Sequence, residues 1–328
     1  MKPPRRYFVG FSLGILILSS CPLVLKADVL TYSVFKTAYY HQTNSTQPVS
    51  VDAPNAYDFA ANMTTSSTND ILTGAIVTTP GANSQDIALA PSAGATFFSA
   101  SVGYFDTKTN LDATFPDDIY TFSINDGNDS AYLTMPTSEI YPAAVPYFDA
   151  TTWAGLQNVD PASPFTLAWN SFIPDPSATE GVFFLRIFDE VTFDTPISIF
   201  GPSYVTAANT GSNILKFATT YRVELIFDNR IETPDAGFGI GVATAEVGFD
   251  NRTYATLTTI LPQLSIMGAG TNVVLSWPMA ASDFQLESTP SLPTNTWTAI
   301  TNLPTVINNF NVLTNPASSF AQFFRLHR

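Results

Sequence analysis

The residues best suited to catalysis are scarce in this chain of 328 residues. It contains two histidines, His41 and His327, and one cysteine, Cys21. A zinc site needs at least three ligands that converge, and a Ser-His-Asp triad would depend on one of these two histidines. Beyond the apolar run at the start of the chain, the sequence has no Gly-x-Ser-x-Gly motif to expose a nucleophilic serine. We therefore predict no catalytic, cofactor-binding or metal-ligating residue, no cofactor, and a protein that is not an enzyme.

Carboxylates leave one enzymatic alternative open. A glycoside hydrolase needs only two acids that face each other across a groove. None of the available glutamates is flanked by the tryptophan-rich, charged sequence that commonly lines a sugar-cleaving groove. A glycoside hydrolase with paired carboxylates therefore stays an alternative, drawn from Glu139, Glu180, Glu190, Glu224, Glu232, Glu246 and Glu287.

Calcium binding is a second chemistry that the acids suggest. Asp117-Asp118 and the run Asn125–Asp129 place oxygen ligands at the two ends of one predicted strand. Calcium takes about six to eight oxygens, commonly from such loops. The spacing departs from the twelve-residue calcium loop, and Asp126-Gly127 is also what a tight hairpin turn requires, because glycine accepts positive φ. We favour the turn and leave calcium binding at Asp126 open.

Two further patterns invite a functional interpretation. Phe227-Asp228-Asn229-Arg230 recurs as Phe249-Asp250-Asn251-Arg252. We interpret both copies as strand ends at which Asp-Asn opens a turn. The pair Tyr39-Tyr40 has rings that would stack on a sugar, although packing in a core or at a sheet edge is the commoner fate of such rings.

The elements that would position these residues are strands. Short runs rich in Phe, Tyr, Val, Ile and Thr recur between clusters of Pro, Gly, Asn and Asp, as sandwiches and barrels require. Residues 120–124 and 131–135 flank the Asp-Gly turn and predict a hairpin. Residues 221–227 alternate large apolar side chains with Arg222 and Glu224, and residues 181–188 indicate a more continuously buried strand.

These strands group into three predicted units. The Pro-rich, polar run 159–164 marks one boundary, and the second lies at 258–262, where the acidic charge stops. The predicted fold is all-β, with two tandem β-sandwiches followed by a small C-terminal β module. The units are an acidic sandwich at 28–164, a second sandwich at 165–261 and the module at 262–328. The short third unit should lean on its neighbour.

Several strand motifs resemble known families. The x-Leu-x-Trp strand at 165–169 and the strand beginning Tyr221-Arg222-Val223 make residues 165–261 resemble a fibronectin type III or immunoglobulin-like sandwich. Residues 262–328 resemble a short C-terminal β module of uncharacterised secreted proteins from verrucomicrobial bacteria. The front half resembles the same group through Thr114-Phe115-Pro116 and Tyr141-Pro142. The module's matching pieces are Leu275-Ser276-Trp277-Pro278, Phe284–Thr289, Trp297 and Phe323–Leu326. This resemblance implies β structure and carries over no activity.

The start of the chain predicts export. Lys2, Arg5 and Arg6 precede an apolar run, and a small residue, Ala27, stands where cleavage would occur. This is the pattern of a secretory signal peptide over residues 1–27. Leu18-Ser19-Ser20-Cys21 also resembles a lipobox, so lipidation at Cys21 and plain cleavage after Ala27 are both kept as alternatives. Either alternative places the protein outside the cell or in the cell envelope.

Charge narrows the choice of partner. The chain has 13 basic and 27 acidic side chains and a formal net charge of −14. Nucleic acid is disfavoured as a partner because phosphate needs clustered Lys and Arg. We predict no transmembrane segment in the mature chain. The predicted function is a non-enzymatic secreted or cell-surface protein for adhesion, matrix building or ligand binding, with an extracellular protein or polysaccharide as partner. The alternative is an accessory carbohydrate-binding protein with loop aromatics of the front unit as its platform.

Overall fold

A computed structural model describes the protein over residues 29–45, 50–51, 55–66, 74–91, 96–124, 127, 129–235, 238, 243–293, 296–317 and 321–328. The predicted signal peptide, Cys21 and the Asp126 side chain of the suggested calcium site lie outside the described residues. Strands account for 53% of the structure and helices for 5%, which confirms the predicted all-β class. No helix in the described part of the chain has the length and apolar character needed to cross a membrane.

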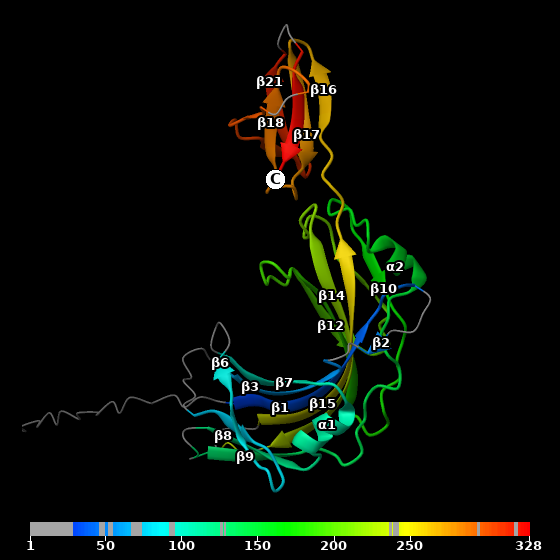
Figure 1. Ribbon diagram of the computed structural model, residues 1–328, viewed down its shortest axis with the longest axis vertical. Helices are drawn as coiled ribbons and strands as arrows, with labels where there is room; N and C mark the ends of the chain where they lie inside the picture. Colours follow the sequence, from blue (N-terminus) through cyan, green and yellow to red (C-terminus); the bar gives the residue numbers. More distant parts are fainter. Residues whose placement is uncertain are drawn as a thin grey trace, which may run out of the picture.

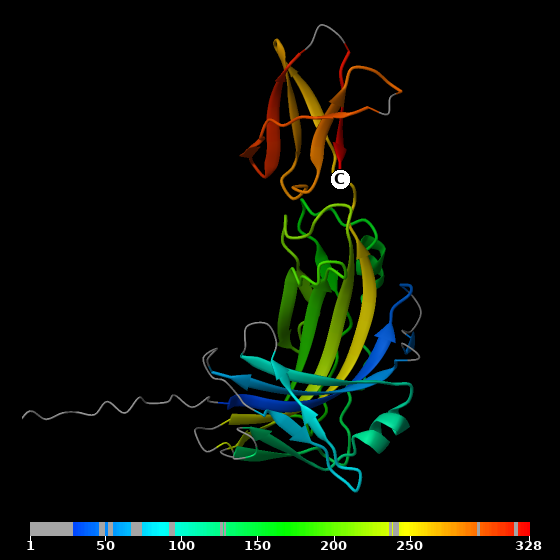
Figure 2. The same ribbon diagram turned by 60° about the vertical axis from the view of Figure 1, so that its left-hand side comes forward.

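One twisted sheet organises most of the molecule (Figure 1). Its nine strands all come from the first 258 residues. The long strands are curved, so the strands from the start of the chain run in a different direction from the strands that come later in the sequence (Figure 2). In spatial order they are β12 (Ile197–Pro202), β11 (Glu180–Phe188), β14 (Thr220–Asp235), β15 (Ala243–Thr258), β1 (Val29–His41), β3 (Tyr57–Thr65), β7 (Phe97–Phe105) and β6 (Ala90–Pro91), with β2 (Ser50–Val51) paired to β1.

This sheet joins the first and second predicted units. β1 and β15 pair in parallel, in a register that runs from Thr31 opposite Thr244 to His41 opposite Tyr254. Main-chain hydrogen bonds therefore run without a break across strands from both sides of the predicted boundary at 164/165. The two predicted sandwiches share their main layer. The division into units at 28–164, 165–261 and 262–328 stays a prediction about which segments fold on their own.

Two smaller layers cover one face of the large sheet. Over its front part lies a four-stranded sheet, whose inward side chains Phe122 and Leu133 meet Tyr32 and Phe249 in a core. The helix α1 (Lys108–Thr114) adds Leu111 to this core, and the hairpin predicted around Asp-Gly is confirmed. The four strands are β5 (Asp86–Ala88), β4 (Ile76–Thr78), β8 (Ile119–Ile124) and β9 (Asp129–Thr134).

A second core lies behind the later strands. It is covered by the two-stranded sheet of β10 (Thr166–Ala168) and β13 (Ala207–Asn209) and by the helix α2 (Ala150–Gly155). Trp169, on the predicted x-Leu-x-Trp strand, packs there with its ring centre 4.9 Å from that of Phe183. The alternation predicted for residues 221–227 is confirmed, since Val223 and Leu225 point into this core.

The last segment forms two further sheets around a third core. Leu275 and Trp277 are buried in it, and Phe217 from the preceding segment joins them. Arg328 Nη1 also donates a hydrogen bond of 2.9 Å to the Ala218 carbonyl. The short segment therefore does contact its neighbour. Its strands are β16 (Ser265–Ala269), β17 (Asn272–Pro278), β21 (Phe310–Pro316) and β20 (Thr305–Ile307) in one sheet, and β19 (Thr298–Ala299), β18 (Gln285–Thr289) and β22 (Phe323–His327) in the other.

Candidate functional site

The face of the large sheet opposite the two cores carries the candidate site. Side chains alternate along a strand, so residues beside the core positions point to this other face. On β15 these are Glu246, Gly248, Asp250, Arg252 and Tyr254, whereas Val247 and Phe249 point into the front core. We call this surface the open face. A groove with a volume of about 530 Å³ runs along it, lined by β1, β3, β7, β11, β14 and β15.

The Phe-Asp-Asn-Arg repeat builds the centre of the groove. The interpretation of both copies as strand ends is wrong, because each lies inside a strand of 16 residues. β14 and β15 are antiparallel, and Asp228 stands directly opposite Asp250. Phe227 is opposite Asn251, and Asn229 is opposite Phe249, so the two copies are related by a local two-fold axis.

The two asparagines of the repeat point away from the groove. The Asn229 side-chain amide donates to the Ile140 carbonyl at 2.6 Å, and that of Asn251 donates to the Pro142 carbonyl at 2.7 Å. Because these bonds satisfy the amides, both positions are compatible with strand structure, although Asp-Asn is typical of turns. We call residues 140–148 the strap, since they cross the covered face between the two cores.

The two aspartates of the repeat point into the groove and are almost completely buried. Arg230 Nε donates to Asp228 Oδ2 at 2.5 Å, and Arg252 Nη2 lies 3.5 Å from Asp250 Oδ2. The Asp228 and Asp250 carboxyl groups lie within hydrogen-bonding reach of each other. Burial and the neighbouring Asp250 raise the pKa of Asp228 well above its usual range, against the opposing effect of Arg230. One proton held between the two carboxyl groups accounts for this arrangement.

A third aspartate, Asp58 on β3, completes the polar floor. Its Oδ2 accepts a hydrogen bond of 2.8 Å from the Tyr39 hydroxyl. Burial raises the pKa of Asp58 while Arg252 opposes the change, and burial also raises the pKa of Tyr39, which stays a hydrogen-bond donor. Several buried atoms here have no hydrogen-bond partner among the described residues, namely Oδ1 of Asp58, Asp228 and Asp250 and Nε of Arg252.

Aromatic rings and guanidinium groups alternate along the same face. The Arg230 guanidinium lies 5.6 Å from the ring centre of Phe35 and 5.2 Å from that of Phe184. The Arg252 guanidinium lies 5.4 Å from the ring of Tyr39. The Phe35 ring also explains Gly248, because a Cβ built at that glycine would come within 2.2 Å of the ring. These pairs hold the cations in place by cation–π attraction.

A second hollow lies toward the far end of β15, beyond the end of β1. It has a volume of about 770 Å³ and is lined by His41, Arg222 and Tyr254, together with Trp153 near the end of α2. The rings of Tyr39 in the first groove and Tyr254 in the second hollow are stacked at 5.7 Å between centres. Burial, opposed by Arg252, raises the pKa of Tyr254 to about 12. The stacked Tyr39 and Tyr254 rings stand between the two hollows.

Most of the other residues suggested by sequence do not join the groove. Asp117 binds Lys36 on the covered face, so it is not free to hold calcium. Of the seven glutamates, Glu246 lines the groove and Glu224 is buried on the same face near Arg222. Glu139 binds Lys36, Glu190 pairs with Arg222, Glu287 pairs with Arg325, and Glu180 and Glu232 interact with each other. In the described part of the chain, no group of three or more His, Cys, Asp or Glu side chains is arranged to hold a metal ion.

The aromatic platform is on strands rather than loops. Tyr39 lies in the groove, whereas Tyr40 points to the other face of β1. Rings from β7 and β11, including Tyr104 and Phe184, line the groove as well. Sequence reasoning missed the groove because its residues come from six strands. The sequence signals for it were the repeated Phe-Asp-Asn-Arg motif and the ring of Tyr39.

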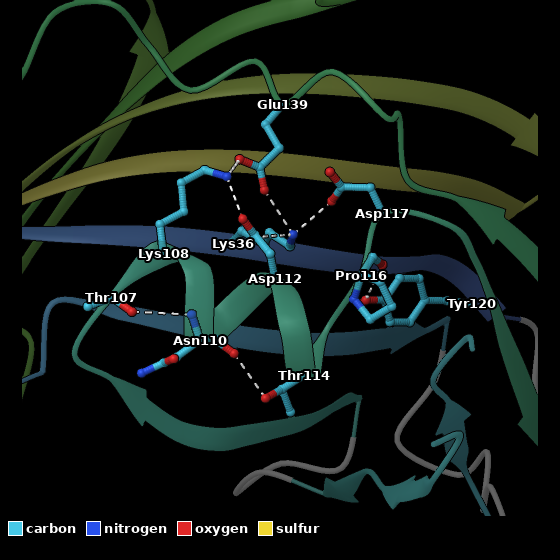
Figure 3. A network of polar contacts seen from close by, with 10 residues as sticks. All are labelled: Lys36, Thr107, Lys108, Asn110, Asp112, Thr114, Pro116, Asp117, Tyr120 and Glu139. Atoms are coloured by element: carbon cyan, nitrogen blue, oxygen red, sulfur yellow. Dashed lines mark hydrogen bonds and ion pairs between the residues drawn. The ribbon is translucent and has the colours of Figure 1, made fainter. Parts of the chain in front are cut away.

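The ion network around Lys36 is the other concentration of charge (Figure 3). Lys36 Nζ lies 2.8 Å from Asp112, 2.7 Å from Asp117 and 2.8 Å from Glu139, and its side chain is completely buried. Lys108 also contacts Asp112 and Glu139. Burial opposes the charge on Lys36, but hydrogen bonds to the three carboxylates raise its pKa. The network ties α1 and the segments after it to β1, which is a structural role.

Comparisons with known proteins give little further guidance. No family model and no curated protein matches the chain, and the resemblance to verrucomicrobial secreted proteins is not supported. Among solved structures, the three fibronectin domains FN1–FN3 of chicken CNTN1 match at 9% identity over 92% of each chain, with a TM-score of 0.21. The D1–D4 ectodomain fragment of ICAM-5 matches at 11% identity over 88% of this chain and 69% of that one, with a TM-score of 0.20.

Domains A168–A170 of titin match at 10% identity over 82% of this chain and 85% of theirs, with a TM-score of 0.17. At TM-scores this low, the overlays do not bear on how the sheets of this chain are arranged.

Proposed function

We propose that this protein is a non-enzymatic, exported protein that binds an extracellular ligand through the open face of its large sheet, in adhesion or matrix building. The observation that carries the proposal is the set of buried, unpartnered polar atoms in the groove. Buried polar atoms in folded proteins are normally hydrogen-bonded, so atoms left without partners at the floor of a groove are suited to a ligand.

The spacing of the acids favours binding over hydrolysis. Catalytic carboxyl groups of retaining glycosidases stand about 5–5.5 Å apart, and those of inverting enzymes stand farther apart to admit water. Asp228 and Asp250 lie within hydrogen-bonding reach of each other, which leaves no space between them for the reacting bond. A glycoside hydrolase built on this pair is therefore disfavoured. An accessory carbohydrate-binding role uses the same groove and needs no reaction.

A groove-filling variant tests the proposal. Ala60 lies on β3 in the groove, and Ala60→Trp would fill the space in front of Asp58. Thr134→Trp adds the same ring to the exposed outer side of β9 and is the matched control. Soluble neutral and charged oligosaccharides and short peptides would be screened by their effect on thermal unfolding.

We expect at least one compound to raise the melting temperature of the wild type and of Thr134→Trp by several degrees, but not that of Ala60→Trp. A ligand at 100 times its Kd stabilises the folded state by about 2.7 kcal/mol. If every stabilising compound acts equally on Ala60→Trp, the open face is not the binding site. If the wild type releases reducing sugar from an oligosaccharide and Asp250→Asn does not, the protein is an enzyme and the non-enzymatic proposal is wrong.

A further inference from the structure

We infer that the groove on the open face takes a stretch of a neutral polysaccharide chain, which rests on the binding function proposed above. Four properties of the groove point to this ligand: the mixture of unpartnered donors and acceptors, the balance of charge, the partly exposed rings and the length of the groove.

The unpartnered atoms require a ligand that both donates and accepts hydrogen bonds. Oδ1 of Asp58 is a buried acceptor, and Nε of Arg252 is a buried donor in the same groove. A hydroxyl group donates one hydrogen bond and accepts two. A ligand with several hydroxyl groups therefore satisfies both kinds of atom. An anion would pair with Arg252 but would be repelled by the carboxylates. A simple cation would pair with the carboxylates but would be repelled by Arg252.

The charges of the groove alternate in sign. Four acids and three arginines line it, and each of Arg230 and Arg252 lies next to an aspartate of the repeat. The raised pKa of Asp228 favours its neutral form, which brings the acids and arginines of the groove closer to balance. A groove of this kind has no net field to attract a highly charged polymer. A neutral chain pays the smallest desolvation cost when it enters.

Rings flank these polar groups. Phe35 and Phe184 are half-buried, and 56% of Tyr104 is exposed. Partly exposed rings beside hydrogen-bonding groups suit a sugar, which has an apolar C–H face and a rim of hydroxyl groups. Along β15, the residues that line the groove run from Glu246 to Arg252. At about 3.3 Å per residue, this distance is about 20 Å, which suits a polymer segment rather than a single sugar.

Affinity electrophoresis in native gels tests the inference with the full chain. Gels would contain one polysaccharide each: laminarin, soluble starch or galactomannan as neutral polymers, polygalacturonate as an anion and chitosan as a cation. Phe184→Ala removes a groove ring, and Asp58→Asn removes a charged acceptor while keeping the shape. Tyr132→Ala removes a ring that is 66% exposed on β9 and is the control. Circular dichroism would confirm that each variant is folded.

We expect at least one neutral polymer to retard the wild type and Tyr132→Ala alike. Retardation should weaken by tenfold or more in Phe184→Ala and in Asp58→Asn. Retardation by charged polymers only, or equal retardation of the groove variants, overturns the inference. If no polysaccharide retards the protein, the inference of a polysaccharide ligand fails. The proposed binding function would still stand if a peptide stabilises the wild type but not Ala60→Trp in the thermal screen. If that stabilisation is also missing, both fail.

Discussion

Lys36 shows how one charge can organise its surroundings. Its ammonium group is removed from water, and three carboxylates replace the lost hydration. Burial of an ion pair is costly, but removal of one partner is costlier, because the remaining charges stay buried without compensation. The position of Lys36 on β1 therefore depends on acids that follow more than 70 residues later in the chain.

Lys36→Met should destabilise the protein by about 3–5 kcal/mol, since it leaves three carboxylates facing one another. Urea unfolding followed by circular dichroism would measure the loss. Lys108→Met is the control, because the Lys108 side chain is 44% exposed and contacts two of the same acids. Its loss should be about 1 kcal/mol or less. Similar losses for the two variants would contradict the assigned role of Lys36.

The pair of Asp228 and Asp250 makes a prediction about pH. Burial and Asp250 raise the pKa of Asp228 in the folded state, so folding favours its protonated form. The stability it contributes is fully present below its unfolded pKa of about 3.8 and is lost as the pH rises through the folded pKa. Asp228→Asn keeps a neutral group of the same shape at every pH.

Relative to the wild type, Asp228→Asn should therefore become more stable as the pH rises from 4 to 8, with a slope of at most about 1.4 kcal/mol per pH unit. Urea unfolding at several pH values would give this difference. Asp106→Asn, at an exposed position, controls for the loss of one negative charge elsewhere. A difference that does not change with pH would show that Asp228 is ionised in the folded protein throughout this range.

At the scale of elements, the strap depends on side chains of the large sheet. Asn229 and Asn251 bind its carbonyl groups from the strands β14 and β15, and the Thr253 hydroxyl donates to the Pro146 carbonyl at 2.6 Å. Gln42 on the other side binds both the amide and the carbonyl group of Phe148. A segment without regular structure is thus held against the sheet by polar groups that strands do not usually bury.

Asn251→Ala should loosen the strap. The carbonyl groups of Pro142 and Ala144 would lose their donor, and an unsatisfied buried group costs about 1–3 kcal/mol. Urea unfolding should show that loss, and hydrogen exchange should become faster at the Phe148 amide than in the wild type. Asn302→Ala, at an exposed position in the last segment, should change neither quantity. An unchanged exchange rate in Asn251→Ala would mean that the strap is held by other contacts.

At the scale of the whole molecule, the parallel pairing of β1 with β15 brings the two ends of the large sheet's sequence together. Ala245, Val247 and Phe249 of β15 are buried in the front core, and Ala255 and Leu257 of the same strand are buried in the second core. One strand therefore serves two cores. The front segment cannot complete its core without residues that come more than 200 positions after β1.

Fragments of the chain test this dependence. Residues 29–164 lack β14 and β15, so this fragment would leave β1 with an unpaired edge and an open core. We expect it to show no cooperative thermal unfolding transition in calorimetry, whereas residues 29–261 should show one. A cooperative transition in the shorter fragment would establish the front segment as a folding unit and support the predicted boundary at 164/165.

The sequence by itself determined the all-β class and the faces of individual strands. These properties follow from local alternation and from turn residues, as in the strand 221–227 and the hairpin at Asp126-Gly127. Each of these inferences needs only neighbours within a few residues, which is why the sequence was sufficient.

Only the tertiary structure decided which strands share a sheet and where the groove lies. The repeat around Asp228 and Asp250 has the composition of a turn, and its strand conformation depends on carbonyl groups of the strap far away in the sequence. Likewise, the parallel contact of β1 with β15 has no local signature, because strand pairing is set by long-range packing and register. The groove exists because that contact brings Tyr39 and Asp58 beside Arg252.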